Sequence, residues 1–216
     1  MGQTSNISRR RKTALEEGSS DYLAKRAELV EIAGRQFKAN GFKATTLAEI
    51  GHKAGLDRAT VYYYFASKEA LFRECLRVGV DANIAECERI FADPTLDAEA
   101  KLRTVIKQLM TAYDQSYPHM YVYIQEEMSR ITTEKSAWAQ RIVANTRIFQ
   151  KIVLGLIAEL IGKGAIRNDI AVSVAANAVF GMVNWTHRWY QPGGSHSADE
   201  VSEAFCEIFF NGMKKH

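Results

Sequence analysis

The sequence predicts an all-α protein in which a small N-terminal helix-turn-helix domain precedes a larger helical domain. Apolar residues recur along it at spacings of three and four, the period of an amphipathic helix, and no stretch alternates as a strand does. Only 3 of the 216 residues are proline, so few helices are interrupted. With 47% hydrophobic and 25% charged residues, the chain has the composition of a folded globular protein and is long enough to bury a sizeable core.

The chain begins with a polar segment and one longer helix. Residues 1–20 end in Gly18-Ser19-Ser20 and predict a flexible basic arm. A helix follows from Asp21, and Asn40-Gly41 ends it, because glycine accepts the left-handed conformation of a helix C-terminus. The apolar positions of this helix are Leu23, Ala27, Val30, Ala33 and Phe37.

Two short, capped helices come next and complete a domain over residues 21–68. Thr46-Leu-Ala-Glu49 is a capping box, so a helix begins there, and it must end at Gly55. Asp57 is a good N-cap for the following helix, as Ser67 is for the one after it. The apolar residues of these three helices are Leu47, Ile50, Ala54, Val61, Tyr64, Phe65, Leu71, Phe72, Cys75 and Leu76.

Residues 69–216 predict a second domain of long helices. Asp93-Pro94, Tyr117-Pro118, Gly162-Lys-Gly164 and Gln191-Pro-Gly-Gly194 mark the breaks between them. The last helix carries a wide apolar stripe, which can form a homodimer interface together with the helix around residues 168–190 or can equally pack inside one subunit. The stripe consists of Val201, Ala204, Phe205, Ile208 and Phe209.

The arrangement of the N-terminal helices predicts DNA binding. In a helix-turn-helix the second short helix lies in the major groove, with its first residues facing the bases. Charge supports this, because residues 1–68 hold 12 Lys+Arg and 7 Asp+Glu, a net of +5, whereas residues 69–216 hold 16 and 18, a net of −2. Arg58 can offer two donors to a guanine edge, and Lys68 adds a cation for phosphates. The residues expected at the DNA are Thr45 or Thr46, Arg58, Ala59, Thr60, Tyr62, Tyr63 and Lys68.

Three consecutive tyrosines lie on the expected reader helix. Because adjacent residues of a helix point about 100° apart, the three cannot all be buried. We expect Tyr64 to face the core together with Phe65, and Tyr62 and Tyr63 to project outward. The alternative is an ordinary aromatic core with Lys68 on a solvated face; the capped short helices and the basic setting favour DNA.

Residues 26–76 resemble the DNA-binding domain of the TetR family of bacterial transcriptional regulators. The resemblance rests on Phe37, Gly41-Phe42, Thr45-Thr46, Ile50, Ala54-Gly55, the run Thr60–Phe65 and Ser67-Lys68-Glu69-Ala70-Leu71. It implies a C-terminal domain for ligand binding and dimerisation, a palindromic operator read by a dimer, and repression relieved by a small molecule. Ala59 departs from the family pattern, where glycine is frequent, and its Cβ alters the approach to DNA.

A second resemblance concerns the effector. The segment from Gly181 to Gly194 is similar to the end of those family members that regulate fatty-acid and steroid degradation and respond to acyl-CoA thioesters. It implies a mostly apolar pocket with a few polar groups and with cations near its mouth for the CoA phosphates. The residues expected to bind this effector are Tyr121, Gln125, Trp138, Arg141, Asn145, Arg147, Asn184, Trp185 and Arg188, with Lys151 as a further cation. The alternative effector is a drug or a free fatty acid. Taken residue by residue, Trp185 and Trp189 are instead expected in a dimer core, and Arg141, Arg147 and Lys151 on a solvated face.

Other classes of protein are disfavoured. The sequence has no Gly-rich phosphate loop, nucleophile elbow or His-Glu-x-x-His, so we expect neither an enzyme nor a cofactor. The five histidines show no metal-ligand spacing, and the three cysteines are too few and too far apart for a disulfide framework, which indicates a reducing, cytoplasmic setting. The charge-free stretch 170–187 is rich in small residues and is too weakly hydrophobic for a membrane span.

Two questions stay open at this level. The basic run Arg9-Arg10-Arg11-Lys12 can reach a minor groove or can serve as a solubilising tail, and the sequence favours neither. An architectural DNA-binding protein is a rival function, although it has little need of a large helical domain behind its reader helix. Release of DNA by a ligand distinguishes a regulator from an architectural protein.

Overall fold

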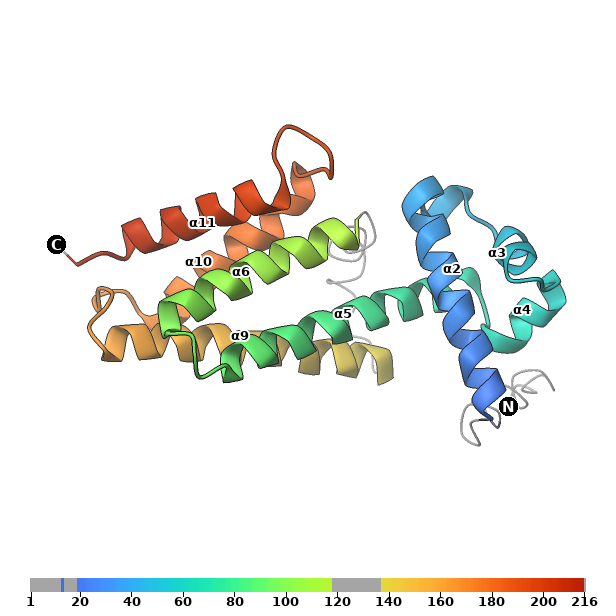
Figure 1. Cartoon of the computed structure of the whole chain (residues 1–216), viewed down its shortest axis with the longest axis horizontal. Coiled ribbons are helices and arrows are strands. Elements are labelled where there is room, and N and C mark those ends of the chain that lie inside the picture. The colour runs from blue at the N-terminus through green and yellow to red at the C-terminus, as the bar shows by residue number, and fades with distance from the viewer. Residues whose placement is uncertain (1–12, 14–18, 118–136, 216) are drawn as a thin grey trace, which may run out of the picture. The chain divides into compact units, whose positions relative to one another are not determined.

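The computed structural model describes residues 13, 19–117 and 137–215, and in this part of the chain it confirms an all-α fold (Figure 1). The chain divides into two compact units, Met1–Val78 and Gly79–His216. This division lies within one helix, whereas the sequence placed it at the start of that helix, between residues 68 and 69. The helices are α2 (Ser20–Ala44), α3 (Leu47–Lys53), α4 (Arg58–Tyr64), α5 (Lys68–Ala92), α6 (Ala98–Gln115), α9 (Ala137–Gly162), α10 (Val172–Trp185), the 3-10 helix η1 (Thr186–Arg188) and α11 (Ala198–Gly212).

The caps expected from the sequence form in the N-terminal unit. The Thr46 hydroxyl accepts a hydrogen bond from the backbone N–H of Glu49 at 3.2 Å, and a Glu49 carboxylate oxygen accepts from the backbone N–H of Thr46 at 2.8 Å. Asp57 caps α4 by accepting from the backbone N–H of Thr60 at 2.6 Å. The break at Gly41 is also present, because this residue has φ 77° and ψ 163° inside the span of α2.

One buried layer joins the helices of the N-terminal unit. Most of the apolar positions expected on α2 lie in it, but Leu23 and Ala27 do not, because the buried stripe of α2 starts from Tyr22 and continues through Leu29 and Ala33. Leu23 is 45% exposed, since it lies about 100° around the helix from Tyr22. The fully buried residues of this layer include Leu29, Ala33, Phe37, Ile50, Val61 and Leu71.

A close approach fixes the reader helix on the helix before it. A Cβ added to Gly51 of α3 would lie 2.8 Å from Cγ2 of Val61 and 2.9 Å from the carbonyl oxygen of Leu56. Only glycine fits between these atoms without a shift of the backbone. The turn then reverses at Gly55, which has a φ of 69°. The angle between α3 and α4 is therefore set by backbone contact.

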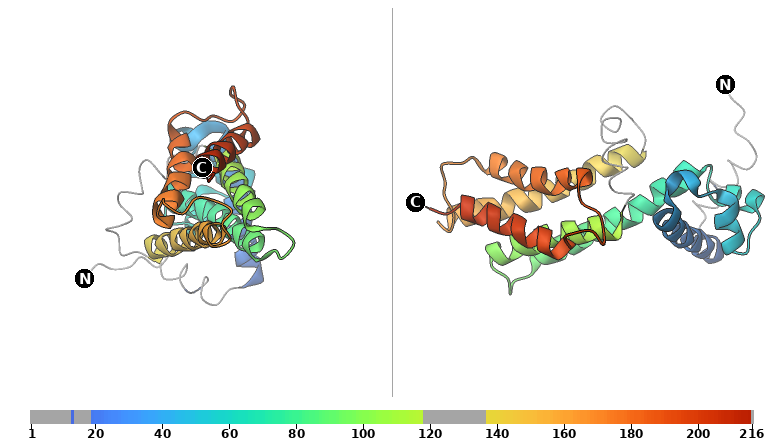
Figure 2. Two further views of the ribbon diagram at one scale, coloured as in Figure 1. Left: turned by 90° about the vertical axis from the view of Figure 1, so that its left-hand side faces the viewer. Right: turned by 90° about the horizontal axis from the view of Figure 1, so that it is seen from above.

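The second unit is a helical bundle. The second half of α5 leads into it, α6 packs against both α9 and α11, and α10 packs against α9 and α11 (Figure 2). The interior is formed by residues such as Leu102, Ile106, Met110, Val153, Leu156, Ile157, Val179 and Val183. No helix in the described part of the chain is both long and apolar enough to cross a membrane.

The apolar stripe of α11 is divided between two faces. Val201 and Phe209 lie in the interior of the subunit, so for these two residues the alternative of packing inside one subunit holds. Ala204 and Ile208 point to solvent, and Phe205 is half-buried. At 100° per residue the five residues span about 140° of the helix circumference, and packing on α6 takes one side of this stripe.

Candidate DNA interface and effector site

The N-terminal turn of α4 is the most exposed part of the helix-turn-helix. Arg58 and Ala59 are exposed and Thr60 is half-buried, while Val61 is fully buried and holds the helix on the core. A helix anchored by one apolar side and capped by Asp57 presents its first residues to the surroundings in a fixed orientation. This is the geometry that a reader helix needs.

Arg58 and Tyr62 form a pair on the exposed side of α4. An Nη2 hydrogen of Arg58 is donated to the Tyr62 hydroxyl at 3.3 Å, and the guanidinium lies 5.7 Å from the centroid of the ring. This hydrogen bond raises the pKa of Arg58 above its ordinary value, so the side chain stays charged. The pairing, which sequence spacing of four residues permits but does not establish, orients the guanidinium along the helix surface.

The other two tyrosines form an aromatic cluster with α2. Tyr64 stacks on Tyr22, with ring centroids 4.9 Å apart, as expected for a residue that faces the core. Tyr63 meets Tyr22 edge-on at 5.4 Å and is half-buried. The expectation that Tyr63 projects outward like Tyr62 therefore needs correction, because the first turn of α2 supplies an aromatic partner from far away in the sequence.

Thr45 and Thr46 were both expected as phosphate contacts, but only Thr46 lies at the surface. Thr45 is fully buried, and its hydroxyl donates to the carbonyl oxygens of Gly41 at 2.9 Å and Gln36 at 3.2 Å. A buried hydroxyl with these partners does not reach a phosphate. Thr46 is exposed at the N-terminus of α3, where its hydroxyl donates to a carboxylate oxygen of Glu49 at 2.9 Å.

Lys68 lies at the start of α5 and is already surrounded by acceptors. Its ammonium donates to the carbonyl oxygens of Phe42 at 2.7 Å, Thr45 at 2.9 Å and Lys43 at 3.3 Å. The nitrogen also lies 4.4 Å from the centroid of the Phe42 ring. The sequence predicts that Lys68 binds phosphates. In the structure its ammonium already has these carbonyl acceptors within the N-terminal unit.

A charged network holds α2, α4 and α5 together. The carboxylate of Glu74 accepts from Nε and Nη2 of Arg77, each at 2.9 Å, and from Arg26 of α2. The Arg26 guanidinium also lies over the ring of Phe65, 4.5 Å from its centroid, at the end of the reader helix. Burial by itself would raise the pKa of Glu74, but the hydrogen bonds from Arg77 and Arg26 outweigh it and lower this pKa to about 2.

We expect Glu74→Gln to destabilise the protein by about 3 kcal/mol at neutral pH, since lowering a pKa from 4.5 to about 2 corresponds to a stabilisation of that size. The carboxylate stabilises the fold above pH 4.5 and loses this effect as the pH falls from there toward 2. Thermal unfolding by circular dichroism across that range should show the two proteins converging at acid pH.

The matched control for this prediction is Glu86→Gln. Glu86 lies on the same helix and pairs with an arginine three residues later, but its side chain is much more accessible to solvent than that of Glu74, so its removal should change stability far less. Equal effects of the two substitutions would contradict the role given to Glu74.

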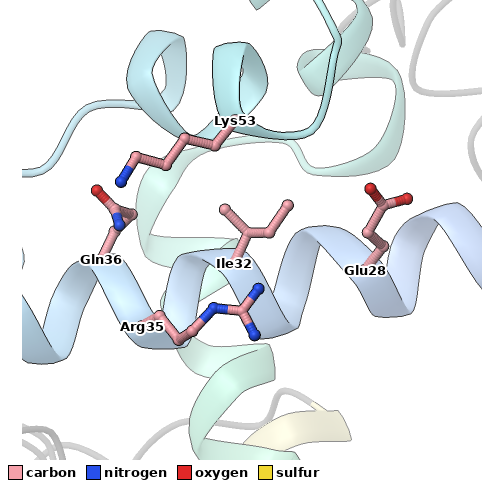
Figure 3. A pocket seen from close by; sticks show the side chains of 5 residues that line it. All are labelled: Glu28, Ile32, Arg35, Gln36 and Lys53. Carbon is pink, nitrogen blue, oxygen red and sulfur yellow. The ribbon is translucent and has the colours of Figure 1, made fainter.

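A shallow groove of about 590 Å³ lies between α2 and α3 in the N-terminal unit, and no sequence motif indicates it. It is lined by Glu28, Ile32, Arg35, Gln36 and Lys53. Figure 3 shows the Lys53 side chain of α3 extending along α2 toward Gln36. Arg35 is paired with Glu31, one turn earlier in α2. Because its lining includes Glu28, Arg35 and Lys53, the groove is polar and mixed in charge.

The expected effector residues do not all converge in the structure. Tyr121 and Gln125, and the side chain of Trp138, lie outside the described residues. Arg147 and Lys151 are exposed on α9. Trp185 is 60% exposed, with the Arg188 guanidinium 5.6 Å from the centroid of its ring.

Two of the expected residues have partners that the sequence did not reveal. Arg141 donates to the carboxylate of Asp81 on α5 through Nη2 at 2.8 Å, and Asn145 donates to the same group at 3.3 Å. Asn184 accepts a hydrogen bond at 2.6 Å from the hydroxyl of Tyr113, a mostly buried residue of α6. The amides of Asn145 and Asn184 are therefore hydrogen-bonded to neighbouring helices, and the exposed Arg141 is paired with a carboxylate.

The described residues contain no group of three His, Cys, Asp or Glu side chains that could hold a metal ion. Burial raises the pKa of the Cys75 and Cys87 thiols to about 12 and that of Cys206 to about 11. Such thiols are not reactive nucleophiles at neutral pH.

Comparison with known proteins identifies the family of this chain. Residues 29–75 match the model of the bacterial regulatory proteins of the tetR family, and residues 95–213 match the tetracyclin repressor-like C-terminal domain. The chain belongs to the TetR family. It is accordingly a transcriptional regulator and not an enzyme.

Relatives of this TetR-family regulator share its whole layout. The HTH-type transcriptional repressor KstR2 of Rhodococcus jostii is 28% identical over 197 residues, covering 91% of this chain and 95% of the relative. The structure of the ketosteroid transcriptional regulator KstR2 of Mycobacterium tuberculosis is 27% identical, with a TM-score of 0.72 over 88% of this chain and 95% of that one. AibR in complex with isovaleryl coenzyme A and operator DNA has a TM-score of 0.68 at 18% identity over 86% of this chain and 98% of that one, which shows a common fold.

Proposed function

We propose that this TetR-family regulator is a repressor that binds a palindromic operator as a homodimer in the bacterial cytoplasm. The exposed N-terminal turn of α4, capped by Asp57 and anchored by Val61, carries this proposal. The N-terminal unit would bind the DNA, and the C-terminal unit would bind the effector and a second subunit. The residues proposed to contact DNA are Thr46, Arg58, Ala59, Thr60 and Tyr62, with Tyr63 at the edge of this surface.

Exposed apolar side chains on α10 and α11 support the dimer. Val174, Trp185 and Ile208 are each about 60% exposed in the single subunit, and Trp189 after η1 is about half exposed. Large apolar groups gathered on two adjacent helices are typical of a protein interface. An interface of two helices from each subunit would cover them and pair two reader helices on one palindrome.

The effector we propose is an acyl-CoA thioester. Support comes from the similarity to KstR2, a ketosteroid regulator, and from AibR, whose structure holds isovaleryl coenzyme A. Asn184, hydrogen-bonded to Tyr113 between α10 and α6, is a polar group suited to orient an acyl or ring system. Binding would release DNA if the ligand prefers the subunit arrangement that does not fit the operator.

A second candidate effector has one observation in its favour. Arg141, expected to meet a CoA phosphate, is paired with Asp81 and would have to exchange that partner. A ligand without phosphates, such as a free fatty acid or a hydrophobic drug, does not need this exchange.

The test is a titration of operator complexes formed with DNA that the protein selects from a random pool. We expect acyl-CoA thioesters of suitable chain or ring type to dissociate the complex, and the corresponding free acids to have little effect. Dissociation by free acids or cationic drugs, with none by thioesters, would establish the second candidate. A protein that selects no DNA sequence at all would contradict the proposal that it is an operator-binding repressor.

A further inference from the structure

The segment 184–190 runs from the last two residues of α10 through η1 to Tyr190, and it has two unlike sides. Trp185 and Trp189 are 60% and 49% exposed, whereas Thr186 and Tyr190 are buried. Exposing the largest apolar side chains while burying a hydroxyl reverses the usual distribution of residues in a folded protein. Such a reversal indicates that another surface covers the tryptophans.

The end of α6 binds this segment at both of its ends. The Tyr113 hydroxyl donates to Oδ1 of Asn184 at 2.6 Å, and the Tyr190 hydroxyl donates to a carboxylate oxygen of Asp114 at 2.5 Å. A hydrogen bond to a carboxylate is stronger than one between neutral groups. Two consecutive residues of one helix therefore hold the first and the last residue of the segment.

The backbone of the segment is also fixed from within. The Thr186 hydroxyl donates to the carbonyl oxygen of Val183 at 2.6 Å. The Thr186 carbonyl oxygen accepts from the backbone N–H groups of Trp189 at 3.0 Å and Tyr190 at 2.8 Å. The Trp189 ring meets Phe205 of α11 edge-on, with 6.4 Å between the ring centroids. The positions of the tryptophans thus depend on this closed turn and on its attachment to α6.

We propose that the end of α6, through Tyr113 and Asp114, positions the segment 184–190 so that its tryptophans pair with a second copy of this chain. Trp185 is the last residue of α10, and Trp189 contacts α11; these are the two helices proposed to form the homodimer. Tryptophan is enriched among the residues that dominate the binding energy of an interface. A side chain that is held in place before association loses less conformational entropy when it binds.

The inference rests on the proposed homodimer and names residues that set the strength of its interface. Tyr113 and Asp114 are positioning residues in this role, because they act through the segment 184–190. Movement at the end of α6 would shift the tryptophans, so the interface is coupled to the interior of the C-terminal unit.

The test is a double-mutant cycle on the dimer dissociation constant with Tyr190→Phe, Asp114→Ala and the double variant. Fluorescence-detected sedimentation of labelled protein, followed over a dilution series, measures this constant. Each single variant removes the same hydrogen bond, so each should raise the dissociation constant about tenfold, and the double variant should raise it by about the same factor. Independent effects that multiply in the double variant, or an unchanged constant in all three, would overturn the proposal.

The matched control is Tyr62→Phe. It removes the hydroxyl of a hydrogen-bonded tyrosine in the N-terminal unit, so the dimer dissociation constant should stay that of the parent. Equal weakening of the dimer by Tyr62→Phe and Tyr190→Phe would also contradict the positioning role.

Asp114→Asn covers the case in which Asp114→Ala does not fold. Asparagine keeps an oxygen that can accept from Tyr190, so this variant should weaken the dimer less than Tyr190→Phe does. A loss as large as that of Tyr190→Phe, or pairing in Tyr190→Phe as tight as in the parent, would overturn the proposal.

Hydrogen–deuterium exchange separates positioning from a general loss of stability. At a concentration where both proteins are dimers, exchange at the amides of Trp189 and Tyr190 should be faster in Tyr190→Phe than in the parent, with exchange in the middle of α6 unchanged. Equal acceleration throughout the C-terminal unit would contradict the positioning role. A parent protein that is a monomer at every concentration would contradict the proposed homodimer itself, whereas a dimer that Tyr190→Phe leaves equally tight would contradict the positioning role alone.

Discussion

Ile208→Asp is expected to convert the protein into a monomer that no longer binds its operator at nanomolar concentration. Ile208 is the most exposed large apolar residue in the described part of the chain, and it lies on α11, which packs against α10. In a two-fold interface each substitution occurs twice, so two unpaired carboxylates would be buried together. At about 3 kcal/mol for each, the dimer dissociation constant should rise about 10⁴-fold.

Sedimentation velocity at micromolar concentration checks this prediction. The matched control is Leu23→Asp, which introduces the same charge at an exposed apolar residue of α2, outside the proposed interface. The control should remain a dimer. An Ile208→Asp protein that sediments as a dimer would place the subunit interface elsewhere.

Arg58→Ala is expected to weaken operator binding by a factor of about 10 to 100 for each half-site and to relax the sequence preference at one position. A bidentate contact from arginine to a base discriminates by about 1–3 kcal/mol, and both half-sites lose it together. Because Arg58 rests on Tyr62 in the free protein, part of the cost of ordering the guanidinium is already met before DNA arrives.

Selection of DNA from a random pool by each variant provides the measurement. Arg58→Lys keeps the charge but not the planar pair of donors. Compared with Arg58→Ala, it should therefore bind DNA more tightly in a sequence-independent way but should still lack the base preference at that operator position. Tyr62→Phe removes only the hydroxyl that accepts from Arg58, and it should give a smaller loss. An Arg58→Ala protein that selects the parent's sequence with equal strength would remove Arg58 from the interface.

Local signals in the sequence accounted for much of the helix-turn-helix. The capping box at Thr46, the cap at Asp57 and the break at Gly41 depend on residues within four positions of one another, and all three form. The exposed face of α4 follows from the same local periodicity. The expectation for Tyr63 needed correction because Tyr22, which is distant in the sequence, packs against its ring. The expectation for Thr45 needed correction because its hydroxyl donates to the carbonyl oxygens of Gly41 and Gln36 in the interior, and residue type alone does not reveal that burial.

The expected effector residues show the same difference between what local sequence signals indicate and what distant partners decide. Arg141 and Asn184 were identified by residue type and by resemblance, and neither signal reveals a partner 60 or more positions away. The structure supplies those partners, Asp81 and Tyr113, and with them the finding that one expected cation is neutralised.

By itself, the sequence determined that this protein is helical, where its N-terminal helices begin and end, and that it resembles the TetR family, because caps, breaks and helical periodicity are encoded within a few residues. Only the tertiary structure decided which side of α11 faces solvent, and that the ammonium of Lys68 holds the carbonyl groups at the end of α2. Those outcomes depend on which helices pack together. A stripe of apolar residues or a single lysine has several possible partners until the fold selects one.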